Sequence, residues 1–281
     1  MLYVNTLRTL LITLWFISSQ SYADTLIITD DTSLTGSFTQ GGLITGYTSP
    51  LNTISFNGEV LRTTPKGHFV FGFGRDAEAT HTLSVTTPGG SNVEKIIQVS
   101  PRVYALQKVN GVPQKTVTPP KKAQQRIQKE TALVKSARRT QSNATSFLEP
   151  FSWPLKGPIT GVYGSQRVYN GTPKRPHFGL DIAAPVGTLV KAPADATVTL
   201  AHQNMYYSGG TLIMDHGYGI SSTFIHLDEV LVNVGDKIKR GDNVAKVGSK
   251  GRSTGPHLDW RINWFHVRLD PALVVPPMEK K

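Results

Sequence analysis

An eight-residue run near the C-terminal end of the chain alternates strictly between apolar and polar side chains. Every second residue of His257–Trp264 is apolar, and the polar positions between them are His257, Asp259, Arg261 and Asn263. A period of two predicts a β-strand with one face in a core. His257 and Asp259 therefore project together from the other face, where an imidazole and a carboxylate can reach one metal ion.

A second His/Asp pair, His177 and Asp181, lies about eighty residues earlier. Gly179 and the Ala-Ala-Pro sequence that follows argue against a helix, and positions four apart in an extended segment share a face. Such a pair alone is weak evidence, because a lone histidine beside an apolar strand is usually a packed residue. Two His and two Asp in two short clusters are, however, enough for a zinc hydrolase site.

The first 23 residues have the features of an export signal. Arg8 gives a basic start, Thr9–Ile17 is apolar, and Ser21-Tyr22-Ala23 resembles a cleavage site. The apolar stretch is too short to span a bilayer. We therefore expect residues 1–23 to be removed and the mature protein to be exported to the periplasm or cell envelope, with no transmembrane segment. The chain has no cysteine, so it forms no disulfide and lacks the cysteine of a lipoprotein.

The net charge of +11 is concentrated in one connecting segment. Residues 24–100 carry four basic and seven acidic side chains, residues 101–146 carry ten and one, and residues 147–281 carry fifteen and eleven. This distribution favours a cationic linker that faces an anionic polymer or surface. Outside the cytoplasm that partner is cell-wall polymer or membrane and not nucleic acid. A solvated linker with no partner is the alternative.

Residues 24–103 are rich in Thr, Ile, Val and Phe and are divided by turn signals. Short strands at such spacing predict a small β-sandwich. Asn57-Gly58, between Ile54–Phe56 and Val60-Leu61, predicts a tight hairpin. No catalytic residue types are grouped in this stretch, so we expect a structural or adhesive module.

Residues 104–146 are interpreted as a basic linker that contains a helix. Val112–Pro120 bears Pro and Thr and reads as extended chain, whereas Lys121–Arg139 has no Gly or Pro and has good helix composition. Its apolar stripe is thin. We therefore expect one basic helix that rests on a neighbouring domain, with a solvated helix as the alternative.

Residues 147–275 are interpreted as a second β domain, and 276–281 as a short tail. The clearest strand-like runs are Thr188–Val190, Ala196–Leu200, Gly210–Met214, Ser221–Ile225 and Val230–Val234. No long helix pattern occurs among them. The predicted fold class is therefore mainly β, with an N-terminal sandwich, a basic helical linker and a C-terminal antiparallel β domain.

Several spaced motifs of the C-terminal part occur in an order that resembles a known family. They are Gly161–Arg167, His177–Gly187, His226-Leu227, Val234–Asp236, Gly241-Asp242 and Val247–Leu258. This order is similar to that of the M23 zinc metallopeptidases, the lysostaphin-like peptidoglycan endopeptidases, over about residues 150–275. The resemblance implies an antiparallel β domain with a groove that holds one Zn²⁺. A biotinyl or lipoyl carrier domain shares the Gly-Asp turns, but this chain has no modifiable Lys in a suitable hairpin.

In the resemblance, the metal ligands fall on His177, Asp181 and Asp259, and the two catalytic histidines fall on His226 and His257. Asp259 is a departure, because the family normally has His there. Carboxylate oxygen binds zinc at nearly the imidazole distance, so the change need not abolish binding. A second negatively charged ligand in place of a neutral imidazole should, however, weaken the Lewis acidity of the ion. We expect one histidine to accept a proton from water and the other to bind the oxyanion, and the sequence does not assign which.

The function that the resemblance implies is zinc-dependent hydrolysis of peptide cross-links in peptidoglycan. Peptidoglycan is then the partner, with other cell-wall enzymes as a further class. The alternatives are an inert member of the same fold that activates a wall amidase, and a plain wall-binding module. Arg261 shares the face of Asp259, and it either orients that carboxylate, binds a substrate carboxylate or forms a structural ion pair. His202, His216 and His266 match no motif and are interpreted as structural.

Overall fold

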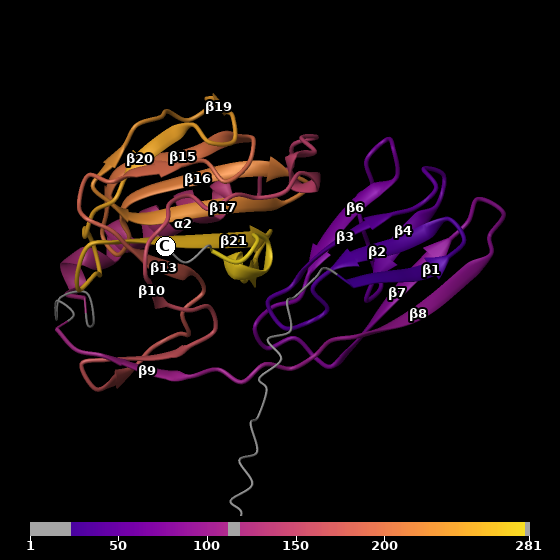
Figure 1. The fold of residues 1–281 in the computed structure, drawn as a ribbon, viewed down its shortest axis with the longest axis horizontal. Coiled ribbons are helices and arrows are strands. Elements are labelled where there is room, and N and C mark those ends of the chain that lie inside the picture. Colours follow the sequence, from indigo (N-terminus) through magenta and orange to yellow (C-terminus); the bar gives the residue numbers. More distant parts are fainter. Residues whose placement is uncertain (1–23, 112–118, 279–281) are drawn as a thin grey trace, which may run out of the picture.

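The computed structural model describes residues 24–111 and 119–278. The predicted export signal and most of the predicted extended linker lie outside the described residues. Two β-rich parts lie side by side, and strand β9 runs from the N-terminal part beneath the C-terminal part (Figure 1). Within the described ranges, no helix is both long and apolar enough to cross a membrane.

The N-terminal part is a sandwich of two four-stranded antiparallel sheets, as predicted. One sheet has the order β1-β2-β3-β6, with β1 Asp24–Thr29, β2 Thr32–Gly36, β3 Leu43–Tyr47 and β6 His68–Gly72. The other has the order β5-β4-β7-β8, with β4 Thr53–Phe56, β5 Glu59–Val60, β7 Thr80–Thr86 and β8 Asn92–Gln98. The core between them takes apolar side chains from both sheets, among them Leu34, Ile44, Ile54, Phe69 and Leu83.

The predicted hairpin at Asn57-Gly58 is confirmed. Phe56 pairs with Glu59, so the turn between the strands contains two residues. Asn57 has φ 50° and Gly58 has φ 84°. A two-residue turn of this hand requires positive φ at both positions, which Asn and Gly tolerate best.

The linker forms a helix where one was expected and a strand where none was. A short 3-10 helix, Lys121–Ala123, leads into α2, Gln124–Ala137. Val134 and Ala137 of α2 pack against Leu200 and Ile213 of the C-terminal sheet. The helix therefore rests on the neighbouring part as predicted. Strand β9, Leu106–Val109, was not predicted, and it pairs in parallel with β11.

The C-terminal part is built on a large antiparallel sheet with the order β10-β13-β21-β17-β16-β15-β19, and β22 pairs with β21. Its strands are β10 Ile159–Gly161, β13 Leu180–Ala183, β15 Ala196–Met205, β16 Gly209–Gly217, β17 Ile220–Leu227, β19 Lys237–Ile238, β21 His257–Trp264 and β22 Val267–Leu269. The smaller elements are β11 Gln166–Tyr169, β12 Thr172–Pro173, β14 Leu189–Lys191, β18 Glu229–Val230, β20 Asn243–Lys246 and the 3-10 turns Ser146–Leu148 and Pro271–Leu273.

The apolar face of β21 is buried as predicted, with Leu258, Trp260 and Ile262 fully buried in the C-terminal core. The polar face is more buried than a half-buried strand implies, because Asp259 is 1% exposed and Asn263 is 0% exposed. The predicted strand Val230–Val234 is wrong, because only Glu229–Val230 is extended and paired. Its remaining residues enter a turn in which the Asp236 carboxylate accepts from the Asn233 backbone N–H at 2.8 Å. Val234 is 62% exposed there.

The two β-rich parts share buried contacts. Arg102, just after the sandwich, donates to the Asp270 carboxylate at 2.8 Å. The Asp270 backbone N–H donates to the Gly41 carbonyl at 2.8 Å. Gly72 lies directly against Leu269, and an added Cβ would stand 2.5 Å from that side chain. These contacts hold the sandwich against the end of the C-terminal sheet that carries β22.

Candidate metal centre

The register of three neighbouring strands brings the two predicted His/Asp clusters together. In the β13–β21 ladder, Asp181 lies opposite Asp259 and Ala183 lies opposite His257. In the β17–β21 ladder, Asp259 lies opposite Ile225, the residue before His226. Residues from three separate segments therefore meet on one face of the sheet.

His177, Asp181 and Asp259 form a buried group whose ligand atoms all lie within 4.8 Å of one another. His177 is 2% exposed, Asp181 6% and Asp259 1%. The distance from His177 Nε2 to Asp181 Oδ1 is 3.0 Å, and that from His177 Nδ1 to Asp259 Oδ2 is 4.0 Å.

Polar atoms of this group are buried without hydrogen-bond partners. Neither ring nitrogen of His177 has a partner of acceptable geometry among the described residues, and Asp181 Oδ1 has none either. Buried polar atoms are nearly always satisfied in folded proteins, and leaving one unsatisfied costs about 1–3 kcal/mol. A cation placed among these atoms would satisfy them. The donor set, one imidazole and two carboxylates, is suitable for zinc.

Each carboxylate of the group is also held by an arginine. Arg261 Nε donates to Asp259 Oδ1 at 2.9 Å, and Arg261 Nη2 donates to Oδ2 at 2.6 Å. Arg167 Nη2 donates to Asp181 Oδ2. A carboxylate offers about four lone-pair positions, so these contacts leave capacity for a metal ion. Of the three roles considered for Arg261, this contact fits two, orientation of the Asp259 carboxylate and a structural ion pair.

These charges keep both carboxylates ionised. Burial alone would raise the pKa of Asp259, but the Arg261 guanidinium outweighs it and holds that pKa far below its usual range. Burial likewise opposes ionisation of Asp181, and His177 followed by Arg167 lowers its pKa nevertheless. Ionised carboxylates are the form that binds a metal.

His226 and His257 lie beside the metal group with their rings 4.9 Å apart. His226 Nδ1 is 2.8 Å from the Lys250 carbonyl, and His257 Nδ1 is 2.8 Å from the Gly255 carbonyl. A carbonyl only accepts, so Nδ1 carries a proton in both rings, and the neutral form of each ring presents a lone pair at Nε2. His257 Nε2 is 3.9 Å from Asp181 Oδ1.

The environment of His226 keeps its imidazole neutral. Burial lowers the pKa of His226 to about 4. Its backbone has φ 64°, a left-handed conformation that is uncommon for a residue other than Gly. Non-glycine residues in this region are frequent at functional sites, where the surrounding structure fixes them. The ring is therefore unprotonated at neutral pH, the form from which Nε2 can accept a proton, and burial makes it a weaker base than an exposed imidazole.

The cavity in front of these side chains is small, about 120 Å³. Its wall includes Asp181, His226 and His257 and also Gln107 and Val109 of β9. Strand β9 stays in place through its ladder with β11, and Gln107 Oε1 accepts from Arg167 Nε at 3.2 Å. The segment that joins the two β-rich parts therefore lines the site.

All five predicted site residues are brought together by the fold, and two contributors were missed. Arg167 ends a motif that the sequence analysis singled out, but nothing in the sequence linked it to Asp181. Leu106–Val109 does not alternate between apolar and polar residues, so the sequence carries no period-of-two signal for β9. Its pairing with β11 is visible only in the folded structure.

Comparisons with known proteins find similarity to one peptidase family. The model of Peptidase family M23 matches residues 175–271. The chain is 37% identical over 87 residues to peptidoglycan DD-endopeptidase ShyB of Vibrio cholerae, a match that covers 31% of this chain and 20% of ShyB. It is 40% identical over 103 residues to DD-carboxypeptidase/endopeptidase Mpg of Neisseria meningitidis, covering 37% of this chain and 24% of Mpg. The matched segments thus span no more than about a quarter of these two relatives.

One solved structure matches nearly the whole chain. It is a Pseudomonas aeruginosa protein assigned to peptidase M23, with a TM-score of 0.65 and 26% sequence identity. The match covers 86% of this chain and 96% of that one, so it includes the N-terminal part as well.

Proposed function

Because residues 175–271 match the model of Peptidase family M23, we propose that this protein is a zinc-dependent endopeptidase that hydrolyses peptide cross-links of peptidoglycan in the cell envelope. One observation carries the proposal. Buried ligand atoms of His177 and Asp181, which lack a hydrogen-bond partner of acceptable geometry among the described residues, converge with the Asp259 carboxylate. Beside them lie His226 and His257, whose Nδ1 atoms face backbone carbonyls. The name of the relative ShyB, a peptidoglycan DD-endopeptidase, supports peptidoglycan as the substrate.

His177, Asp181 and Asp259 would hold the ion. Bound zinc supplies Lewis acidity toward a peptide carbonyl and a water molecule. His226, which burial keeps neutral, accepts the proton of the attacking water at Nε2. His257 presents a second Nε2 beside the metal group, and in its imidazolium form, with the added proton taken from solvent, it would donate from that atom to the oxyanion that develops on the carbonyl.

The two arginines offset the effect of a second carboxylate ligand. Two carboxylates without partners would weaken the Lewis acidity of an ion, as expected from the sequence. Arg167 and Arg261 draw negative charge from Asp181 and Asp259 through charge-assisted hydrogen bonds. We infer that this compensation lets Asp259 replace the usual histidine.

The test combines metal analysis with digestion of a defined substrate. The protein without residues 1–23 is purified, its zinc per chain is measured, and cross-linked peptidoglycan is digested with wild type, His177→Ala and His202→Ala. His202 lies outside the site and is the matched control. We expect one zinc per chain and cleavage in wild type and His202→Ala, and loss of both in His177→Ala. Zinc binding without cleavage, after chelation and reloading, would contradict the proposal.

A second candidate function is a catalytically inert domain that binds the wall or activates a wall amidase. The observation that favours it is the two-pronged contact of Arg261 with Asp259, which occupies both oxygens of the atypical ligand. The digestion experiment separates the two candidates. An inert scaffold leaves cross-links intact, and it increases release of peptides from glycan only when an amidase is added.

The proposed location is the periplasm or cell envelope, by way of the predicted export signal. The basic segment 101–146, with ten basic residues and one acidic residue, would hold the enzyme on the anionic wall. A fusion of residues 1–23 to a reporter that is active only outside the cytoplasm tests the export step.

A further inference from the structure

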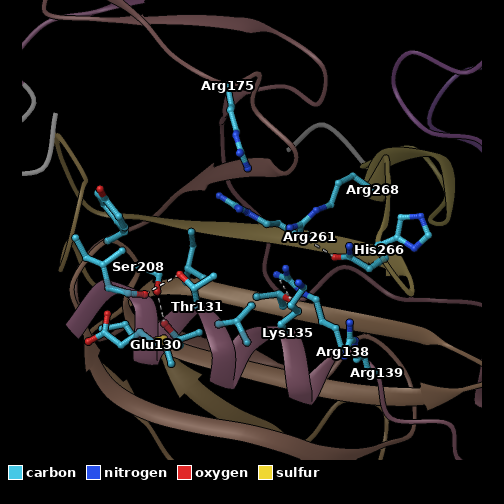
Figure 2. Close-up of a pocket in the computed structure, with 18 of the residues that line it drawn as sticks. Glu130, Thr131, Lys135, Arg138, Arg139, Arg175, Ser208, Arg261, His266 and Arg268 are labelled. Atoms are coloured by element: carbon cyan, nitrogen blue, oxygen red, sulfur yellow. Dashed lines mark hydrogen bonds between the residues drawn. The ribbon is translucent and has the colours of Figure 1, made fainter. Parts of the chain in front are cut away.

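A second, larger cavity lies on the same face of the sheet as the metal group. Its volume is about 720 Å³, and it is enclosed between α2 and strands β16, β17 and β21 (Figure 2). Arg261 lines it, two residues along β21 from Asp259. The two sites are therefore neighbours along one strand, because two strand residues span about 7 Å.

The cavity concentrates positive charge. Figure 2 shows cationic side chains around it from α2 below, from β21 and β22, and from the loop that carries Arg175. The cations of its lining are Lys135, Arg138, Arg139, Arg175, Arg261 and Arg268. Its one acidic residue is Glu130, whose two oxygens already accept from Arg126 Nε at 2.6 Å and from the Tyr206 backbone N–H at 2.7 Å.

Two of these cations are largely buried without an acidic partner among the described residues. Arg138 Nη2 donates to the Thr223 hydroxyl at 3.2 Å, while its Nε is buried and has no hydrogen-bond partner there. Arg268 Nη1 donates to the Asn263 side-chain carbonyl at 3.3 Å. Burial lowers the pKa of both arginines, and nearby Arg261 lowers both further.

Helix docking alone does not account for this arrangement. A cation near the last turn of a helix is favourable, and Arg139 meets that preference from solvent. Arg138 instead turns toward the sheet, where one bond to a neutral hydroxyl uses one of its five N–H donors. Its unpartnered Nε and the uncompensated charge beside it point to an anion that the cavity receives.

We propose that this cavity binds the carboxylate of an acidic peptide, and that Arg138 and Arg268 are the residues that bind it. A guanidinium matches a carboxylate in geometry and charge. The lining also includes the apolar side chains of Ile127, Val134 and Ile225. A bare inorganic anion would leave them uncovered, whereas a peptide covers them. That this peptide is a wall peptide on its way to the metal group rests on the proposed function.

The test measures peptide binding to the metal-free protein, so that no cleavage occurs. The probe is the peptide Ala-Glu-Lys-Ala-Ala with a free C-terminus, compared with Ala-Gln-Lys-Ala-Ala amide, by calorimetry in 0.15 M salt. Binding is measured for wild type, Arg138→Gln, Arg268→Gln and Lys129→Gln. Lys129→Gln is the matched control, because it removes one charge from α2 outside the cavity lining.

We expect wild type to bind the acidic peptide at least tenfold more tightly than the neutral one, as for hydrogen bonds to charged groups. Each arginine variant should lose most of that preference, and Lys129→Gln should keep it within about twofold. Circular dichroism verifies folding, and Arg268→Gln carries the test if Arg138→Gln does not fold.

Three results would overturn the inference. One is equal affinity of wild type for the two peptides. Another is an equal loss of affinity in Lys129→Gln and Arg138→Gln, which would indicate general attraction to charge. The third is that inorganic phosphate binds as tightly as the acidic peptide with the same dependence on Arg138, which would make the cavity a site for small anions. Loss of the proposed peptidase function would appear separately, as intact peptidoglycan with the carboxylate preference retained.

Discussion

Two buried histidines of the C-terminal sheet differ in how their ring nitrogens are satisfied. His216 is fully buried, with Nδ1 2.8 Å from the Asp195 carbonyl and Nε2 2.8 Å from the Ser222 hydroxyl. His177 is 2% exposed, and neither of its ring nitrogens has a partner of acceptable geometry among the described residues. The two rings are almost equally buried, but only the ring nitrogens of His216 have hydrogen-bond partners. We therefore interpret His216 as a residue that stabilises the fold and His177 as one that is available to a ligand.

Substitution of the two histidines should therefore change two different properties, the stability of the fold and the function of the metal group. Removing His216 leaves a carbonyl and a hydroxyl without partners, so the fold should lose stability. Removing His177, His226 or His257 should instead change metal binding or catalysis. The following predictions test this division.

The largest effect is expected from His226→Ala. Loss of a proton acceptor typically lowers kcat by 10²- to 10⁴-fold, or about 3 to 5 kcal/mol. Zinc per chain should stay at the wild-type value, since His226 is not in the metal group. Steady-state hydrolysis of a labelled cross-linked peptide measures the rate.

The matched control is His216→Ala, which should lower the free energy of unfolding by about 2 to 4 kcal/mol while the folded protein keeps its kcat. If His216→Ala lowered kcat as much as His226→Ala does, the division between the two kinds of histidine would be wrong.

A somewhat smaller effect is expected from Arg261→Gln. The change leaves the Asp259 carboxylate buried without its guanidinium, and breaking a buried ion pair on one side costs about 3 kcal/mol or more. Urea unfolding of the metal-free protein measures the loss, and added zinc should restore part of it. Asp259→His removes the other half of the same pair, so we expect it to lower stability as well.

The control for Arg261→Gln is Arg252→Gln. Arg252 lies over the rings of Tyr169 and Tyr207 and forms no ion pair with a described carboxylate. Its loss should cost roughly 1 kcal/mol, the value of a cation–π contact. Equal losses in the two variants would show that the ion pair with Asp259 has no special weight.

Metal binding should raise the free energy of unfolding through His177, Asp181 and Asp259, and His216 should make no difference to that gain. At a free zinc concentration one hundred times the dissociation constant, a ligand that binds only the folded state adds about 2.7 kcal/mol. We expect that increment in wild type and in His216→Ala, and none in His177→Ala. Urea unfolding with and without a chelator measures it, and an increment that survives in His177→Ala would remove this residue from the proposed ligand set.

The elements best predicted from the sequence were those with a local cause. Alternation in His257–Trp264 fixed both the strand and its buried face, and Asn57-Gly58 fixed a turn because few other residues accept its φ values. The predicted strand Val230–Val234 was wrong because a local contact outside the apolar run determined its conformation. Its apolar run looked extended, but the Asp236 carboxylate at its end stabilises a turn.

What the sequence could not give depends on contacts between distant residues. The spaced motifs indicated which five residues would form the site, but not the ion pairs Arg167–Asp181 and Arg261–Asp259 that surround it. The pairing of β9 with β11 joins residues about sixty positions apart. The cavity between α2 and the C-terminal sheet arises where the helix packs on the sheet, so no pattern within the helix sequence could predict it.

The smallest expected effect is the part of the pH dependence of the free energy of unfolding that His216 contributes. Burial lowers the pKa of His216 to about 4, from the usual value near 6.5. The unfolded state then binds more protons than the folded state between these values. The stabilisation is complete above pH 6.5 and is lost as pH falls toward 4.

At pH 5 the loss from this one residue should be about 2 kcal/mol relative to pH 8. Measuring the free energy of unfolding of the metal-free protein at the two pH values, in wild type and in His216→Gln, isolates it, because glutamine does not titrate. We expect the variant to be less stable at pH 8 and to lose about 2 kcal/mol less than wild type on acidification. An identical loss in both proteins would mean that His216 can accept a proton in the folded state, and burial would then not hold its ring neutral.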